Sequence, residues 1–137
     1  MEFDALLVLE TKVKRDWDII REILTRLEDF SDTDGTLSLS DFPENRASEY
    51  SYHVELLIEA GLIEGQMART LSRGPIQFIA RRLTWSGHEF LDSIRSDTVW
   101  NKTKKTFAEK GIDMTFELVR SVASDISVAL IRGATGI

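Results

Sequence analysis

The chain has 137 residues, a length that fits one domain, and its composition of 42% hydrophobic and 29% charged residues is that of a folded protein. It contains no cysteine, which excludes disulfides and thiolate metal sites and suits a reducing compartment. The apolar runs are too short for a membrane helix, and the first residues are acidic where a signal peptide would be basic. We therefore expect a cytoplasmic protein.

The charge is distributed unevenly along the chain. The net charge is −6, with residues 1–65 carrying 6 Lys/Arg and 16 Asp/Glu and residues 66–137 carrying 11 and 7. This asymmetry has two interpretations: two solvated faces of different sign, or a basic surface in the second half that meets an anionic partner. The negative total counts against a nucleic-acid ligand, since duplex-binding domains are usually basic.

Residues 1–13 form a leader for which the sequence predicts no definite structure. From Lys14 onward, apolar residues recur every three or four positions, which predicts an amphipathic helix that ends at the turn-forming residues 31–35. Alternation over residues 36–39 predicts a short strand. Only residues 41–47 then remain before the next helix.

A second helix is predicted over residues 48–60. Ser48 is a candidate N-cap, and an apolar stripe follows it along the helix. Gly61 fits the position after the helix, where a left-handed conformation is needed. Residues 62–83 then predict a β-hairpin with arms at 62–70 and 76–83. The hairpin contains one acidic residue, Glu64, and four arginines: Arg69, Arg73, Arg81 and Arg82.

Three helices are predicted in the remainder of the chain. The first is capped by Thr84 or by a capping box at residues 86–89, and the second is capped by Asp97 and runs through Lys110 to a stop at Gly111. The last opens at Asp113 and carries a long apolar stripe, for which we expect one of two roles: folding back onto the domain, or pairing with the same helix of a second chain in a homodimer. The stripe comprises Phe116, Val119, Val122, Ile126 and Leu130.

The order of these elements predicts a mainly α (α+β) fold. It corresponds to a winged helix-turn-helix-like domain with a β-hairpin wing and additional C-terminal helices. The predicted division is a leader at residues 1–13, a winged-helix domain at 14–96 and a helical extension at 97–137.

Several segments carry a resemblance to known proteins. Residues 51–64 (SYHVELLIEAGLIE) resemble the recognition helix and first wing strand of bacterial winged-helix regulators. Residues 14–21, 52–64 and 83–92, with 97–102, are similar to a family of uncharacterised bacterial and phage proteins, domain of unknown function 2513. The resemblance covers residues 14–110 and implies a winged-helix-like fold, with no settled activity. Residues 41–47, which include Pro43, leave room for a positioning helix of two turns at most, which weakens the expectation of ordinary helix-turn-helix docking on DNA.

Two elements supply candidate DNA contacts. The candidates on and before the second helix are Arg46, Ser48, Ser51 and Tyr52, and those on the hairpin are Arg69, Arg73, Arg81 and Arg82. Phosphate would repel the three glutamates of that helix. The helix therefore has a second interpretation, as an ordinary amphipathic helix with no role in DNA binding. The hairpin arginines have a second interpretation as well, because charged residues keep a two-stranded ribbon soluble and protect its edge.

No pattern in the sequence predicts catalysis. His53 is interpreted as a structural residue and His88 as a surface or helix-packing residue, and the two lack the partners that a zinc site requires. Asp16 and Asp18 point apart on a helix, so they do not form a carboxylate pair. The three tryptophans are assigned to packing, and no phosphate-binding loop or nucleophile motif is present. We expect neither enzymatic activity nor a cofactor.

Two functions remain open at this point. The first is a DNA-binding transcriptional regulator of bacterial or phage origin, with a basic wing on the phosphate backbone. The second is a protein-interaction module, such as a phage-encoded inhibitor, whose acidic first half occupies a basic surface of its partner. The acidic helix and the short positioning segment favour the second function, whereas the arginine-rich hairpin favours the first.

Overall fold

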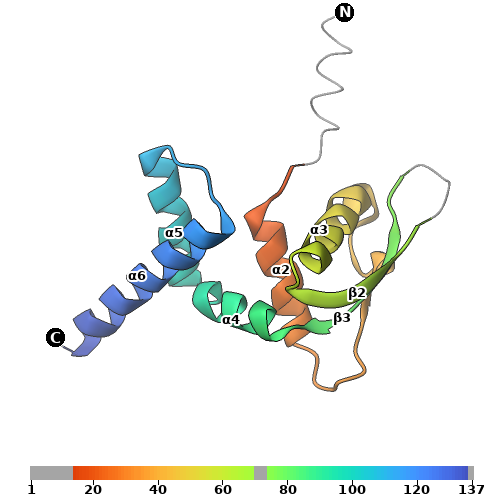
Figure 1. The fold of residues 1–137 in the computed structure, drawn as a ribbon, viewed down its shortest axis with the longest axis horizontal. Helices are drawn as coiled ribbons and strands as arrows, with labels where there is room; N and C mark the ends of the chain where they lie inside the picture. Colours follow the sequence, from red (N-terminus) through yellow and green to blue (C-terminus); the bar gives the residue numbers. More distant parts are fainter. Residues whose placement is uncertain (1–13, 70–73, 136–137) are drawn as a thin grey trace, which may run out of the picture. The chain divides into compact units, whose positions relative to one another are not determined.

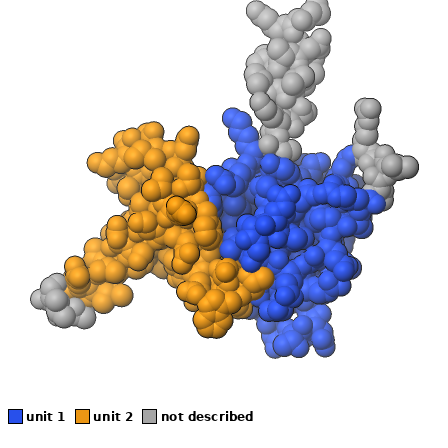
Figure 2. Space-filling model, in the orientation of Figure 1, with its two compact units in different colours: residues 1–83 blue, residues 84–137 orange. Residues whose placement is uncertain are grey.

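The computed structural model describes residues 14–69 and 74–135, so the predicted leader and Arg73 lie outside the described residues. The chain forms two compact units, Met1–Leu83 and Thr84–Ile137 (Figure 2). In the described part, five α-helices and one three-stranded antiparallel sheet give a mainly helical α+β fold (Figure 1). The predicted fold class is confirmed.

The first unit follows the predicted order of helix, short strand, helix and hairpin. Its helix α2 begins after Asp16, whose side chain accepts hydrogen bonds from the backbone N–H groups of Asp18 and Ile19. The elements in chain order are α2 (Trp17–Glu28), β1 (Leu37–Ser38), η1 (Leu39–Asp41), η2 (Glu44–Arg46), α3 (Ala47–Glu59), β2 (Ile63–Ala68) and β3 (Gln77–Leu83).

The segment before α3 contains two single 3₁₀ turns, η1 and η2, instead of a positioning helix. Pro43 lies between them in an extended conformation and lacks the backbone N–H that a continuous helix would use. The predicted cap at Ser48 is wrong, because α3 continues directly from η2 and its N-cap is Arg46, with no side-chain capping bond. Gly61 has a φ of 74°, the left-handed conformation predicted for the end of this helix.

The sheet has the order β1-β3-β2, so β3 is the central strand. One of its faces is buried, with Leu37, Phe78 and Ala80 each at most 4% exposed. Both α2 and α3 contact the strands and each other (Figure 1). The core of this unit therefore lies between the two helices and the inner face of the sheet.

A β-bulge interrupts the pairing of β2 with β3. Glu64 pairs with Arg82 but Gly65 pairs with Ala80, so Arg81 is the extra residue of β3. As a consequence the strict alternation is broken, and both arginines are exposed. A Cβ atom on Gly65 would lie 2.5 Å from the carbonyl oxygen of Ile79, so only glycine fits at this point of the bulge.

The second unit contains α4 (Trp85–Ile94), α5 (Asp97–Lys110) and α6 (Phe116–Thr135). Thr84 caps α4 by accepting from the N–H of Gly87, so the capping box predicted at residues 86–89 is wrong. Similarly, Ser96 rather than Asp97 caps α5, and the Thr115 hydroxyl accepts from the N–H of Leu118 in the first turn of α6. Gly111 ends α5, as predicted, and adopts the left-handed conformation.

The aromatic rings of Phe90 in α4 and Phe116 in α6 lie 4.7 Å apart between centroids. This contact places α4 in the same unit as α5 and α6, whereas the sequence interpretation placed residues 84–96 with the preceding domain. Among the described residues, no helix is both long and apolar enough to cross a membrane.

We predict that Gly65→Ala lowers the free energy of unfolding by about 1–3 kcal/mol, because the added methyl group meets backbone atoms that move only with the whole strand. Chemical denaturation followed by circular dichroism measures the change. Gly133→Ala is the matched control, since a Cβ there meets no atom within 4 Å and alanine favours a helix. An unchanged stability for Gly65→Ala would contradict the account of the bulge.

Candidate functional site

Helix α3 exposes one of its faces to solvent. Four residues spaced as i, i+4, i+7 and i+11 share this face, of which Tyr52 is 38% exposed and Glu55 half-buried. We call this the α3 surface; it consists of Ser48, Tyr52, Glu55 and Glu59. The opposite side of the helix supplies core residues, including Val54 and Leu57.

Arg69, at the end of β2, forms an ion pair with Glu55 of the α3 surface. At the N-terminal edge of α3, Arg46 donates to the Glu49 carboxylate at 2.9 Å and lies over the ring of Tyr50. This hydrogen bond and the negative charge of Glu49 raise the pKa of Arg46 above its ordinary value. Each of the two arginines beside α3 is thus matched by a glutamate of the same helix.

Ser51 does not belong to this surface, although the sequence interpretation placed it among the DNA contacts. It is only 3% exposed. Its hydroxyl donates to the carbonyl oxygen of Ile76 at 2.7 Å and accepts from the N–H of Ile76 at 3.0 Å. The side chain therefore links α3 to the residue that precedes β3 and cannot reach a ligand. Sequence periodicity did not reveal this role, because a serine next to an apolar stripe fits an exposed position equally well.

His53 is fully buried and has a structural role, as predicted. Its Nε2 accepts from the backbone N–H of Asp16 at 2.7 Å, so Nδ1 must be the donor to the carbonyl oxygen of Glu49, 2.6 Å away. The ring is therefore held as the neutral Nδ1–H tautomer. Asp16 is the cap of α2 and is not part of a carboxylate site, and His88 is exposed.

Tyr50 connects α3 to α2 on the buried side of the helix. Its hydroxyl donates to Glu22 Oε1 at 2.6 Å, and its ring stacks on Phe42 at 4.4 Å. Burial is the main reason why the pKa of Tyr50 rises to about 12, and the hydrogen bond to Glu22 and the negative charge of that carboxylate raise it further. The pair fixes the rotation of α3 relative to α2.

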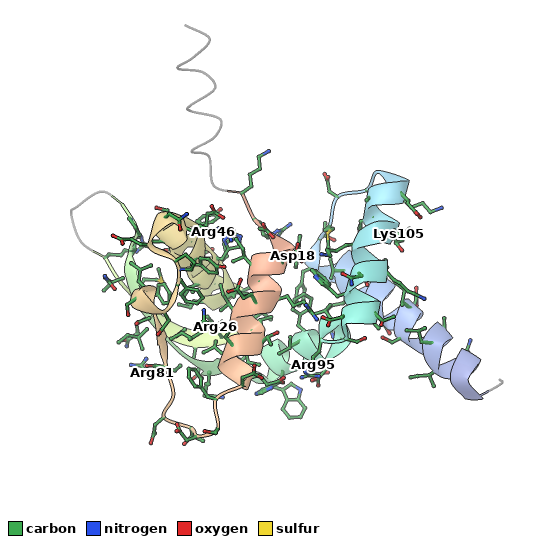
Figure 3. All side chains as sticks on the ribbon, turned by 180° about the vertical axis from the view of Figure 1, so that it is seen from behind. Asp18, Arg26, Arg46, Arg81, Arg95 and Lys105 are labelled. Atoms are coloured by element: carbon green, nitrogen blue, oxygen red, sulfur yellow. The ribbon has the colours of Figure 1, made fainter. Side chains whose placement is uncertain are left out.

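The two arginines near the base of the hairpin lie apart from the α3 surface. Arg82 makes a bidentate pair with Glu64 on the neighbouring strand, with N–O distances of 2.9 and 2.7 Å. Arg81 is exposed and forms no ion pair within residues 14–69 and 74–135. Figure 3 shows Arg46 and Arg81 at well-separated places on the first unit. The predicted contacts thus divide into Arg46, Ser48, Tyr52 and Arg69 around α3, and Arg81 with Arg82 elsewhere.

The outer face of the sheet has a shallow hollow that the sequence interpretation missed. It has a volume of about 340 Å³, and Ile79, one of the residues that line it, is 43% exposed. Ser38, Gln66 and Gln77 also line it. Strict alternation along residues 76–83 would have placed Ile79 outside, since its neighbours Phe78 and Ala80 face the core.

The three tryptophans differ in exposure. Trp17 and Trp100 are buried, but Trp85 is 79% exposed, so its assignment to packing is wrong.

The predicted dimerisation stripe of α6 is only partly buried. Phe116 and Val119 pack within the second unit, Val122 and Ile126 are half-buried, and Leu130 is 38% exposed. No three His, Asp or Glu side chains of the described part are grouped so that they could hold a metal ion.

Comparison with known proteins identifies the family of this α+β chain. Residues 14–113 match the family described as "Hypothetical protein (DUF2513)", and the chain belongs to this family, as its motifs predicted. An uncharacterized protein of Haemophilus influenzae is 44% identical over 114 residues, covering 83% of this chain and 95% of that protein. No solved structure matches the chain.

We predict that the stability of the first unit falls as the pH rises from about 10 to about 12. The ordinary pKa of tyrosine is 10.0 and that of folded Tyr50 about 12, so the folded state holds this proton more tightly than the unfolded state. The resulting stabilisation is complete below the lower value and is lost as the pH passes the upper one. Denaturant unfolding measured at several pH values tests this.

The control for this pH dependence is Tyr50→Phe, which removes the titrating hydroxyl and keeps the ring against Phe42. This variant should be less stable at neutral pH, because Glu22 loses its donor, and its stability should change less over the alkaline range. An identical pH dependence in the two proteins would contradict the role assigned to Tyr50.

Proposed function

We propose that this chain is a non-catalytic winged-helix module that binds another protein through the α3 surface and the adjoining end of β2. The observation that carries the proposal is the charge balance beside α3, where Arg46 is paired with Glu49 and Arg69 with Glu55. A surface of paired charges around an exposed tyrosine suits a protein partner, since tyrosine and arginine are enriched at protein interfaces.

Duplex DNA fits this surface less well. Binding to a phosphate backbone depends on cations that neutralise phosphates and release their counterions. Here a phosphate would have to displace a carboxylate from each arginine and would then lie close to that carboxylate. Glu59 adds a further negative charge on the same face.

The winged-helix assignment is supported by the order of α2, β1, α3 and the hairpin, with β1 paired to β3. The reduction of the positioning helix to η1 and η2 leaves α3 without the helix that crosses the DNA backbone in ordinary helix-turn-helix docking. The non-catalytic role is supported by His53, since backbone groups occupy both of its nitrogens.

We predict that a photo-crosslinking benzophenone side chain in place of Tyr52 yields a discrete protein adduct when the variant is irradiated in the cells that produce the chain. The adduct should be destroyed by protease and unaffected by nuclease. Gel electrophoresis with mass spectrometry identifies the crosslinked protein. The same side chain at Lys105, an exposed position on α5 (Figure 3), should not form this adduct.

Adding Glu55→Arg to the Tyr52 variant should remove the adduct, because the substitution replaces a balanced pair with two adjacent cations. A nuclease-sensitive adduct would contradict the protein-binding proposal and support the DNA-binding alternative. Equal labelling from Tyr52 and Lys105 would also contradict it, since the contact would not be specific to α3.

A DNA-binding regulator is the second candidate, and it is favoured by the bulge that exposes Arg81 and Arg82 side by side. In this alternative the hairpin, rather than α3, contacts phosphates. Reversing Arg73, Arg81 and Arg82 together to glutamate would then abolish duplex binding. Affinity that survives this change at moderate salt would exclude the hairpin as the contact.

A further inference from the structure

Helix α4 has an outward face that its own unit leaves uncovered. Trp85, Glu89 and Asp92 are spaced as i, i+4 and i+7, so they lie within about 60° of one another around the helix axis. The buried residues of α4 lie on the opposite side of the helix: Gly87, Phe90, Leu91 and Ile94. At 79%, Trp85 is the most exposed large apolar side chain of those that the structure describes.

The indole of Trp85 and the carboxylate of Glu89 form a fixed pair on this face. The indole Nε1–H donates a hydrogen bond to Glu89 Oε1, which holds the ring beside the carboxylate while most of the ring stays exposed. In the described part of the chain no cation pairs with Glu89, whereas Asp92 accepts from Arg95 at 2.6 Å. The pair therefore combines an aromatic ring whose face is electron-rich with a carboxylate whose charge is not neutralised.

The first unit contains a similar pair that is completed by an arginine. Arg46 lies over the ring of Tyr50, 5.4 Å from its centroid, and donates to the carboxylate of Glu49 at 2.9 Å. One guanidinium thus contacts an aromatic ring and a glutamate together. The Trp85–Glu89 pair offers the same two groups without the cation.

The other two tryptophans show that the indole rings of this chain accept cations. Arg15 lies 4.6 Å from the ring centroid of Trp17, and Lys104 lies 5.6 Å from that of Trp100. Within residues 14–69 and 74–135, no cation of the chain lies over Trp85. The missing group at Trp85 is therefore a cation that another molecule would supply.

We propose that the Trp85–Glu89 pair is a docking site for an arginine side chain of a partner protein. The planar guanidinium stacks on the indole and donates to Oε2 of Glu89, a combination that suits arginine better than lysine. A nucleic-acid base could also stack on the ring, but the carboxylate repels its phosphates. This inference goes beyond the proposed function, because α4 belongs to the other compact unit.

A titration of the full chain followed by NMR tests the site. The probe is a capped Gly-Arg-Gly peptide, and its reference is the same peptide with citrulline, the uncharged analogue of arginine. Trp85→Phe assigns the indole N–H resonance of Trp85 by removing it. We expect the arginine peptide to shift this resonance saturably, with a dissociation constant in roughly the millimolar range for a single exposed side chain. No saturable shift, or an equal shift from the citrulline peptide, would overturn the proposal.

Glu89→Gln separates the charge of this pair from the position of the ring. Glutamine keeps an oxygen that accepts from the indole but removes the charge, so the arginine peptide should bind about tenfold more weakly. Glu117→Gln is the matched control, because it removes an exposed carboxylate from α6 of the same unit and should leave the affinity unchanged. Circular dichroism verifies that both variants are folded. Equal affinities of the two variants would mean a general attraction to an acidic chain and would overturn the proposal.

The same resonance distinguishes the partner protein from other occupants. If a second copy of this chain supplied the arginine, the Trp85 resonance would shift with protein concentration in the absence of peptide, and this shift would overturn the proposal. An oligothymidylate should leave the resonance in place, because Glu89 repels phosphates. A saturable shift from the oligothymidylate would assign the ring to nucleic acid and would also overturn the proposal.

Discussion

The hydroxyl of Ser51 donates to the carbonyl oxygen of Ile76 and accepts from the N–H of the same residue, so one side chain satisfies both backbone groups just before the central strand. Because Ser51 is buried, this link fixes the rotation of α3 against the sheet. The neighbouring residues then take opposite roles: Tyr52 faces outward and His53 is buried in contact with Asp16. The position of the α3 surface therefore depends on a contact inside the first unit.

The exposed ion pairs are individually weak and contribute little to stability, since pairs in solvent are worth about 1 kcal/mol or less. Their importance lies in how much arginine charge they leave unmatched for a ligand. Arg69 is 65% exposed but is matched by Glu55, and Arg82 is matched by Glu64 across the hairpin. A surface of paired charges favours a partner whose own charges of both signs match those positions. This fits the proposed protein partner better than the uniform negative charge of a phosphate backbone.

Much of the fold was predictable from the sequence, because periodicity and glycine positions are local signals. The order of the elements, the end of α3 at Gly61 and the family motifs all followed from short segments. The site was less predictable. The bulge that exposes both Arg81 and Arg82 depends on pairing between strands, and the burial of Ser51 depends on the distant residue Ile76. The ion pairs of Arg69 and Arg82 also join separate elements. Composition alone therefore could not show that these two arginines are matched by glutamates.

The central claim is that the two arginines beside α3, Arg46 and Arg69, are balanced by glutamates of that helix. A titration of the wild-type chain with random-sequence duplex DNA, followed by fluorescence anisotropy at low and moderate salt, tests it most directly. The account predicts no measurable affinity at moderate salt and only weak binding at low salt, with an increase when Glu49→Gln and Glu55→Gln release their arginines. Micromolar or tighter binding by the wild-type chain, falling steeply as salt is added, would contradict it.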